Sequence, residues 1–234
     1  MVHNNAIRGN LGHGLYILLD QSKTATVTNN LIDGHDGVGV SCKIDGAGGA
    51  ARIVDNTIVN TTNDGIQLKG IGSGEVCGNT IMYAKKYGLS LQTSYDSRIY
   101  LNNFLNNIDD VDIHNSTNTG NSAHPLPYVY DGAGYVSKLG NNWGSYQGVD
   151  EDNDGIGDVP QSLGQEQDDY PIMSDIMLGD PNLDSKVNGQ DLVTVKRIIL
   201  GEEPPTPQAD CDSNKLVDGR DLICINKKIV GILY

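Results

Sequence analysis

The sequence predicts an all-β solenoid, a parallel β-helix, followed by a small α-helical module with two EF-hand-like calcium loops. Three observations support this multidomain fold class. A repeat of about two dozen residues runs through the first half of the chain. The 29 glycines fit a chain rich in turns better than a helical protein. Near the carboxyl terminus a second repeat, with an offset of 30 residues, places Asp and Asn at regular spacing before apolar residues at helical spacing.

The first repeat aligns on asparagines that lie 25, 26, 23 and 24 residues apart, namely Asn5, Asn30, Asn56, Asn79 and Asn103. In four copies a glycine and alternating apolar residues follow, as in Gly65-Ile66-Gln67-Leu68. Alternation with a period of two predicts short strands, each with one buried face. Such strands share a continuous core when they stack about 4.8 Å apart. We therefore predict a β-helix of about five coils over residues 1–144.

The repeated asparagine has a physical reason, because it tolerates left-handed turns and its amide can hydrogen-bond along a stack. These copies resemble the right-handed β-helix repeats of carbohydrate-binding and sugar-hydrolysing proteins, and this resemblance implies a right-handed coil. The first copy begins almost at Met1, so we expect that further coils once preceded it and that the β-helix is truncated at its N-terminus.

An acidic segment, residues 145–177, carries nine acidic residues and no Lys or Arg. Its oxygen donors have calcium-loop spacing, with Gly155 at position 6 and candidate ligands at positions 1, 3, 5, 7 and 9: Asp150, Asp152, Asp154, the carbonyl of Ile156, and Asp158. Position 12 is Gln161, so we expect Asp168 or Asp169 to supply the last carboxylate. We predict one calcium ion here, in a segment that caps the β-helix or links it to the module.

The elements Asn141-Asn142-Trp143-Gly144, Asp154-Gly155-Ile156-Gly157-Asp158 and Asp169-Tyr170-Pro171 resemble the C-terminal end of NosD-like β-helix proteins. That family is described as copper-linked. The clustered donors here are all oxygens, which favours calcium over copper.

The module, residues 178–234, contains two matching loops. Loop one offers Asp180, Asn182, Asp184, the carbonyl of Lys186, Asn188 and Asp191 at positions 1, 3, 5, 7, 9 and 12. Loop two offers Asp210, Asp212, Asn214, the carbonyl of Leu216, Asp218 and Asp221 at the same positions. A short amphipathic helix follows each loop. We expect one calcium ion in each loop.

Two loop–helix units with Asp at position 12 resemble type I dockerins. The resemblance implies binding to a cohesin domain through residues at positions 10, 11, 17 and 18, which are Gly189, Gln190, Lys196 and Arg197 in repeat one and Gly219, Arg220, Asn226 and Lys227 in repeat two. Position 6 departs from the calcium-loop pattern, because Ser185 and Lys215 replace glycine, and we expect a strained or relaxed turn there. A two-loop calcium buffer without a partner is the alternative.

Neither catalysis nor zinc binding has a clear signal. Asp64, Asp109, Asp110 and Asp112 are interpreted as turn and coil-edge residues, so no catalytic residue is assigned. The four cysteines lack CxxC spacing. Cys211 and Cys224 could pair in an oxidising compartment, but buried free thiols are the reading we favour.

The net charge of −14 argues against nucleic-acid binding, and no apolar run reaches the roughly 18 residues of a membrane span. We expect an extracellular or cell-surface, cellulosome-like protein in which a dockerin anchors a carbohydrate-associated β-helix to a cohesin, with a polysaccharide as a second partner. The alternatives are a polysaccharide lyase or hydrolase with its site on the β-helix, and a NosD-like metal-handling protein.

Overall fold

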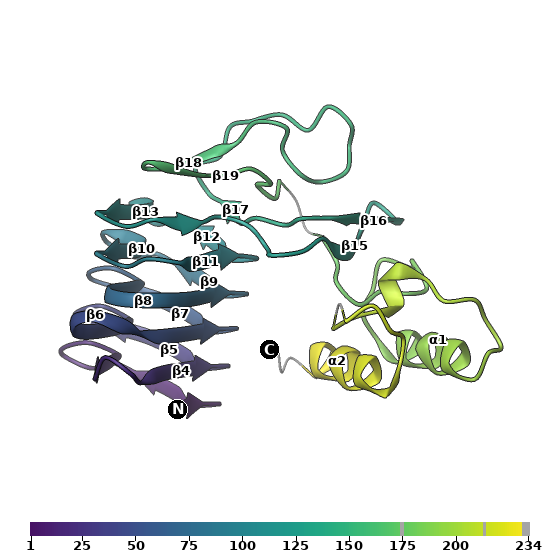
Figure 1. The fold of residues 1–234 in the computed structure, drawn as a ribbon, viewed down its shortest axis with the longest axis horizontal. Helices are drawn as coiled ribbons and strands as arrows, with labels where there is room; N and C mark the ends of the chain where they lie inside the picture. Colours follow the sequence, from purple (N-terminus) through teal and green to yellow (C-terminus); the bar gives the residue numbers. More distant parts are fainter. Residues whose placement is uncertain (174–175, 213, 231–234) are drawn as a thin grey trace.

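The computed structural model describes residues 1–173, 176–212 and 214–230, with the backbone alone for residues 45–47. The chain forms a right-handed parallel β-solenoid of about five turns plus two helices, as predicted (Figure 1). The last four residues of the predicted module, 231–234, lie outside the described residues. Within the described part of the chain, no helix could cross a membrane.

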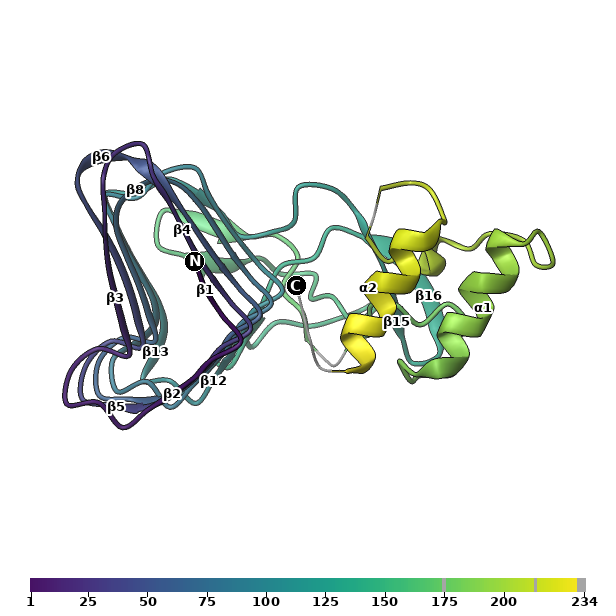
Figure 2. The same ribbon diagram turned by 90° about the horizontal axis from the view of Figure 1, so that it is seen from below.

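Two parallel sheets form the walls of the solenoid, whose coils overlie one another when viewed along the stack (Figure 2). The larger sheet contains β1 (Val2–His3), β3 (Leu15–Leu19), β4 (Thr24–Thr28), β6 (Val40–Val54), β8 (Ile66–Cys77), β10 (Tyr87–Gln92), β11 (Ser97–Tyr100), β13 (Asp109–His114) and β14 (Asn118–Thr119). The smaller sheet contains β2 (Ala6–Arg8), β5 (Leu31–His35), β7 (Thr57–Thr61), β9 (Thr80–Met82), β12 (Asn103–Leu105) and β17 (Asn142–Trp143).

Each coil contributes apolar side chains to one continuous core, including Ile32, Ile58, Ile81 and Phe104 from the smaller sheet. The regular spacing of glycines along the repeat has a steric cause. A Cβ added to Gly65 would lie 2.7 Å from the carbonyl oxygen of Gly88 in the next coil, which is closer than real Cβ atoms approach. Glycine at this place lets consecutive coils approach each other.

A ladder of side-chain amides, buried except for Asn5 at its exposed end, runs the length of the solenoid through Asn5, Asn30, Asn56, Asn79, Asn102 and Asn141. Each Oδ1 accepts the backbone amide and the side-chain amide of the asparagine in the preceding coil. The predicted fifth anchor, Asn103, was wrong by one residue. Phe104 must point inward, so alternation places Asn103 on the strand and Asn102 in the ladder.

Two antiparallel hairpins interrupt the solenoid pattern: β15 (Leu126–Tyr130) with β16 (Ala133–Ser137), and β18 (Gln161–Leu163) with β19 (Glu166–Asp168). The first lies between coil and module, and its Tyr135 carbonyl accepts a 3.3 Å hydrogen bond from Gln208 Nε2. Sequence reasoning did not predict either hairpin.

The module contains α1 (Gly189–Ile199), the 3-10 turn η1 (Pro207–Ala209) and α2 (Gly219–Ile229). The helices share an apolar core formed by Val195, Ile198 and Ile225, which lie at the predicted helical spacing, together with Ala209 of η1. The expectation of free thiols was wrong for Cys211 and Cys224, which form a disulfide with Cα atoms 5.9 Å apart. The helix after loop two returns to the start of that loop, and this proximity is a tertiary feature that cysteine spacing alone does not reveal.

Candidate metal sites and docking face

The three predicted loops share one backbone arrangement. In each, the aspartate at position 1 accepts the amides of positions 5 and 6 through its two oxygens. Asp180, for example, accepts Asp184 N on Oδ1 at 3.2 Å and Ser185 N on Oδ2 at 2.9 Å. The carboxylate therefore holds the loop in a tight ring.

Position 6 has a positive φ in all three loops, at +88° for Gly155, +60° for Ser185 and +72° for Lys215. Glycine adopts this conformation freely, whereas other residues are disfavoured there by roughly 1–2 kcal/mol. The predicted strain at Ser185 and Lys215 is therefore present in the backbone.

Carboxylate oxygens converge at two of the loops. Oxygens of Asp210, Asp212 and Asp221 lie within 4.8 Å of one another, and the same limit holds for Asp150, Asp152 and Asp158. The pKa of Asp152 is raised, chiefly by the neighbouring negative charge of Asp154. Such crowded acids repel until a cation or a proton separates them.

Loop one has a different signature at position 12. Asp191 is fully buried, and its Oδ1 has no hydrogen-bond partner. Burial, assisted by the charges of Asp180 and Asp184, raises the pKa of Asp191 to about 6. A buried carboxylate oxygen without a donor is costly, and a cation in the loop would satisfy it.

Other predicted ligands have additional or different contacts. Asn188 and Asp218, at position 9, are the N-caps of α1 and α2 and accept the amides of Gln190 and Arg220. Asn182 and Asn214 bond neighbouring loop carboxylates, and Asp154 Oδ2 accepts a 3.3 Å hydrogen bond from Tyr128. Ligation by the carbonyls of Lys186, Leu216 and Ile156 stays a prediction.

The expectation of an extra ligand for the acidic loop was wrong for Asp168, and for Asp169 it stays a prediction. Asp168 is fully buried and ends the asparagine ladder, where its Oδ2 accepts Asn141 N at 2.7 Å and Trp143 Nε1 at 2.9 Å. Its carboxylate therefore points into the solenoid core and is occupied by the ladder. Asp169 is exposed and accepts Gln167 Nε2. The ladder's need for a last acceptor was the signal that could have identified Asp168.

The predicted docking residues lie on the surface of the module, with Lys227 half-buried. Between the helices runs a groove of about 430 Å³ whose lining includes Lys196, Asn226 and Lys227, together with Leu192, Val193, Leu222 and Ile223. Val193 and Ile223 are 48% and 59% exposed and occupy the same position in the two repeats. The docking residues predicted from the sequence do not include this apolar pair, although the offset of 30 residues relates its two members.

The acidic residues considered for catalysis have structural contacts. Asp110 accepts both the amide and the hydroxyl of Ser145, at 3.1 and 2.8 Å, and so ties a turn to the last coil. Asp112 pairs with His114 at 2.9 Å. Asp64 is buried beside Lys86 and Gln67. Nothing in these contacts forms a nucleophile and base pair.

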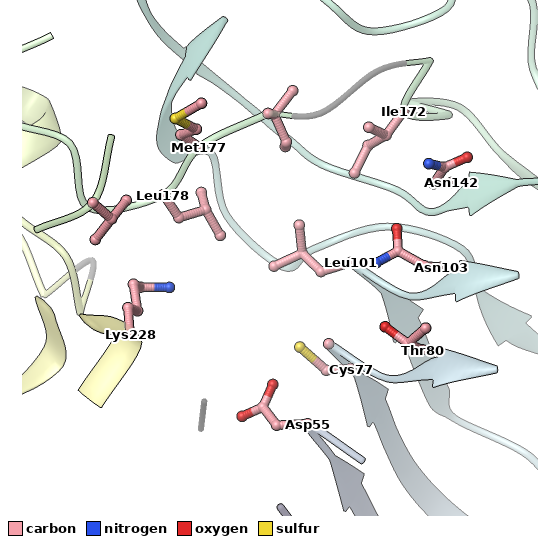
Figure 3. A pocket seen from close by; sticks show the side chains of 13 residues that line it. Asp55, Cys77, Thr80, Leu101, Asn103, Asn142, Ile172, Met177, Leu178 and Lys228 are labelled. Atoms are coloured by element: carbon pink, nitrogen blue, oxygen red, sulfur yellow. The ribbon is translucent and has the colours of Figure 1, made fainter. Parts of the chain in front are cut away.

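A cavity of about 450 Å³ separates the solenoid flank from α2 (Figure 3). Asp55 and Lys228 line it, together with Cys77 and Leu101. Burial raises the pKa of Asp55 to about 8, and the nearby Lys228 opposes that shift. Burial also lowers the pKa of Lys228. These groups lie where the module rests against the coils.

No curated protein and no solved structure matched the chain. A family model described as a periplasmic copper-binding protein (NosD) matches residues 1–148. The match covers the coils, the β15–β16 hairpin and Asn141–Gly144, whereas sequence reasoning had attached the resemblance to the segment that begins at Asn141. Because more than half of the chain is matched, the chain belongs to the NosD family.

Proposed function

We propose that this NosD-family solenoid carries a calcium-dependent docking module that resembles a type I dockerin and binds a cohesin on a scaffold or surface protein. The observation that carries the proposal is the orphaned, fully buried Oδ1 of Asp191 at position 12 of loop one. Its place in a ring closed by Asp180 is that of the last ligand of an oxygen cage.

Repetition supports a cation in the module. Loop two brings three carboxylates within 4.8 Å, with the same contacts to the position-1 aspartate as loop one. We propose one calcium ion in each of these loops and a third at Asp150, Asp152 and Asp158, where the backbone arrangement recurs.

Copper, the metal in the family's description, fits the donors poorly. Copper favours imidazole and sulfur ligands. The close groups of three candidate ligands found among the described residues consist of aspartates alone. His35 has both ring nitrogens in contacts, at 3.1 Å to Asn10 N and to Ile7 O, and Cys42 is fully buried in the core. We derive no copper chemistry for this chain.

The exposed groove supports a protein partner. An apolar centre formed by Val193 and Ile223 with lysines at its rim is the usual anatomy of a protein interface. The cations favour a partner with acidic residues around a flat apolar patch. The disulfide between Cys211 and Cys224 supports an oxidising compartment, in agreement with an extracellular, cell-surface or periplasmic location.

A polysaccharide remains our second proposed partner. Side chains on the outer face of the larger sheet stack in register, with Lys43 beside Lys69, and the half-buried Gln67 accepts a hydrogen bond from the buried Ser41 hydroxyl. Donors repeated at the coil spacing suit a repeating polar polymer. Binding to a panel of immobilised polysaccharides, with Gln67→Ala and Lys69→Ala as the loss variants, tests this; equal retention of variant and parent contradicts it.

A pull-down of the full chain against a panel of cohesins, with calcium or with chelator, tests the docking function. We expect capture only with calcium, and at least a tenfold loss in Val193→Asp, Ile223→Asp and the pair Lys196→Ala with Arg197→Ala. Val136→Asp, at a site 51% exposed on β16, is the matched control and should bind like the parent. Capture that ignores chelator, or that survives the groove substitutions, contradicts the proposal.

A further inference from the structure

The two repeats of the module differ in one covalent feature. The disulfide joins Cys211, at position 2 of loop two, to Cys224 in the middle of α2. The same positions in repeat one hold Pro181 and Thr194. The cross-link ties the start of loop two to α2 and so removes unfolded conformations of repeat two, which opposes the repulsion among the carboxylates of that loop.

The position-12 aspartates of the two repeats differ in their hydrogen-bond partners, and repeat two is again the better satisfied. Both oxygens of Asp221 accept backbone amides, Oδ1 from Asp212 at 3.2 Å and Oδ2 from Asp218 at 2.8 Å. Asp191 Oδ2 accepts the Asn188 amide at 2.7 Å, but Oδ1 has no partner. Repeat two satisfies its buried carboxylate by itself, and repeat one does not.

The amide that would complete repeat one belongs to Asn182, which corresponds to Asp212. The Asn182 backbone amide lowers the pKa of Asp191 and so favours its charged form, but this amide lies outside hydrogen-bond geometry with Oδ1. Asp180 and Asp184 add negative charge around the same oxygen. A divalent cation would neutralise this charge and take the place of the missing donor.

Repeat two also has outside support. Gln208, just before loop two, is 6% exposed and bonds the Tyr135 carbonyl of the hairpin. At the far end of α2, Lys228 lies at the solenoid flank beside Asp55 (Figure 3). Helix α1 packs on α2, farther from the coils (Figure 2). The disulfide, the Gln208 hydrogen bond and the contact with the solenoid thus all restrain repeat two.

We propose that the two repeats have different cation dependence: the disulfide keeps repeat two folded without a cation, and repeat one folds on it only when a cation occupies loop one. The inference rests on the calcium sites of the proposed function. Cation concentration then controls half of the docking face, the half that contains Val193 and Lys196, while the other half persists in an oxidising compartment.

Hydrogen–deuterium exchange of the full chain, read by mass spectrometry, tests the division. In chelator with the disulfide intact, amides of α2 should exchange at least tenfold more slowly than those of α1. Adding calcium should slow α1 at least tenfold and change α2 by less than threefold. In the double variant Cys211→Ser with Cys224→Ser, or after reduction of the parent, both helices should exchange rapidly in chelator and slowly in calcium.

Peptides from β8 serve as an internal control, since the solenoid should stay protected throughout. Equal loss of protection in α1 and α2 in chelator, with the disulfide intact, overturns the inference, as does an α1 that stays protected without calcium. If calcium affects neither helix, the metal assignment fails as well. If the exchange pattern holds but no cohesin is captured, only the proposed partner is lost.

Discussion

Truncation of one ladder side chain, Asn79→Ala, should destabilise the solenoid far more than its small volume suggests. The Asn79 side chain is fully buried. Its Oδ1 accepts the Asn56 backbone amide at 2.9 Å and the Asn56 side chain at 3.0 Å. Its Nδ2 donates to Ile53 O at 2.8 Å and to Asn102 Oδ1 at 2.9 Å. Alanine removes these four contacts and a fifth, from Nδ2 to Cys77 O at 3.1 Å, where water cannot replace them.

The cost follows from the groups left behind. A buried amide without an acceptor costs about 1–3 kcal/mol, and each remaining bond contributes about 1 kcal/mol net. We therefore expect Asn79→Ala to lower the free energy of unfolding by about 3–5 kcal/mol. Asn5→Ala removes the same side chain from the exposed end of the ladder, where water substitutes, and should cost less than about 1 kcal/mol.

Trp143 provides the assay, because it is the single tryptophan of the chain, is 3% exposed, and stacks on Phe104 in the last coil. Urea unfolding followed by its fluorescence reports the whole stack. If Asn79→Ala and Asn5→Ala differ by less than about 1 kcal/mol, the buried ladder is not a source of stability, and the explanation of the repeated asparagine is wrong.

Three other outcomes can be measured. Gly65→Ala should cost at least about 2 kcal/mol in urea, because its Cβ would meet the Gly88 carbonyl at 2.7 Å, whereas Gly12→Ala, with open space around it, should be neutral within about 0.5 kcal/mol. Ser185→Gly should stabilise the calcium-loaded module by about 0.5–1 kcal/mol in thermal melts, because relief at φ +60° exceeds the entropy cost of glycine. In chelator the helical circular dichroism should melt at higher temperature at pH 5 than at pH 7.5: the pKa of Asp191 is raised from 3.8 to about 6, so its contribution to stability is lost as pH rises through 6, and calcium should reverse this order.

Local chemistry made much of the architecture predictable. The spacing of asparagines and glycines predicts the coils because the asparagine hydrogen bonds and the close backbone approach at each glycine recur once per turn. The sequence alone contains that period. The tight turns of the loops also depend on local contacts, since those of Asp180 and Asp210 stay within five residues, whereas calcium binding by the loops stays a prediction. The apolar spacing of α1 and α2 likewise predicts most of the side chains that form the shared core, although Ile199 and Val230 share that spacing and are exposed.

What sequence reasoning missed depends on contacts between distant segments. Asp168 reads as one more acid of an acidic stretch, and only the stacked coils bring it to Asn141 and Trp143. Cys211 and Cys224 lie 13 residues apart, and the fold of the module decides that they meet. The one-residue error at Asn103 arose because two adjacent asparagines fit the pattern, and the inward direction of Phe104 distinguishes them.

The ladder and the loops use the same side-chain chemistry with opposite demands for an ion. In both, side-chain oxygens accept backbone amides that would otherwise be unpaired. An asparagine carries its own donor, so each Nδ2 satisfies the next oxygen and a stack such as Asn56 on Asn79 closes without charge. An aspartate has only acceptors, so a ring of them accumulates charge that the backbone cannot neutralise. Asp168 avoids this problem because four donors meet it at the end of the ladder. Asp191 has one such donor, the Asn188 amide on Oδ2, and none on Oδ1, and for that reason we propose a cation in the module and none among the coils.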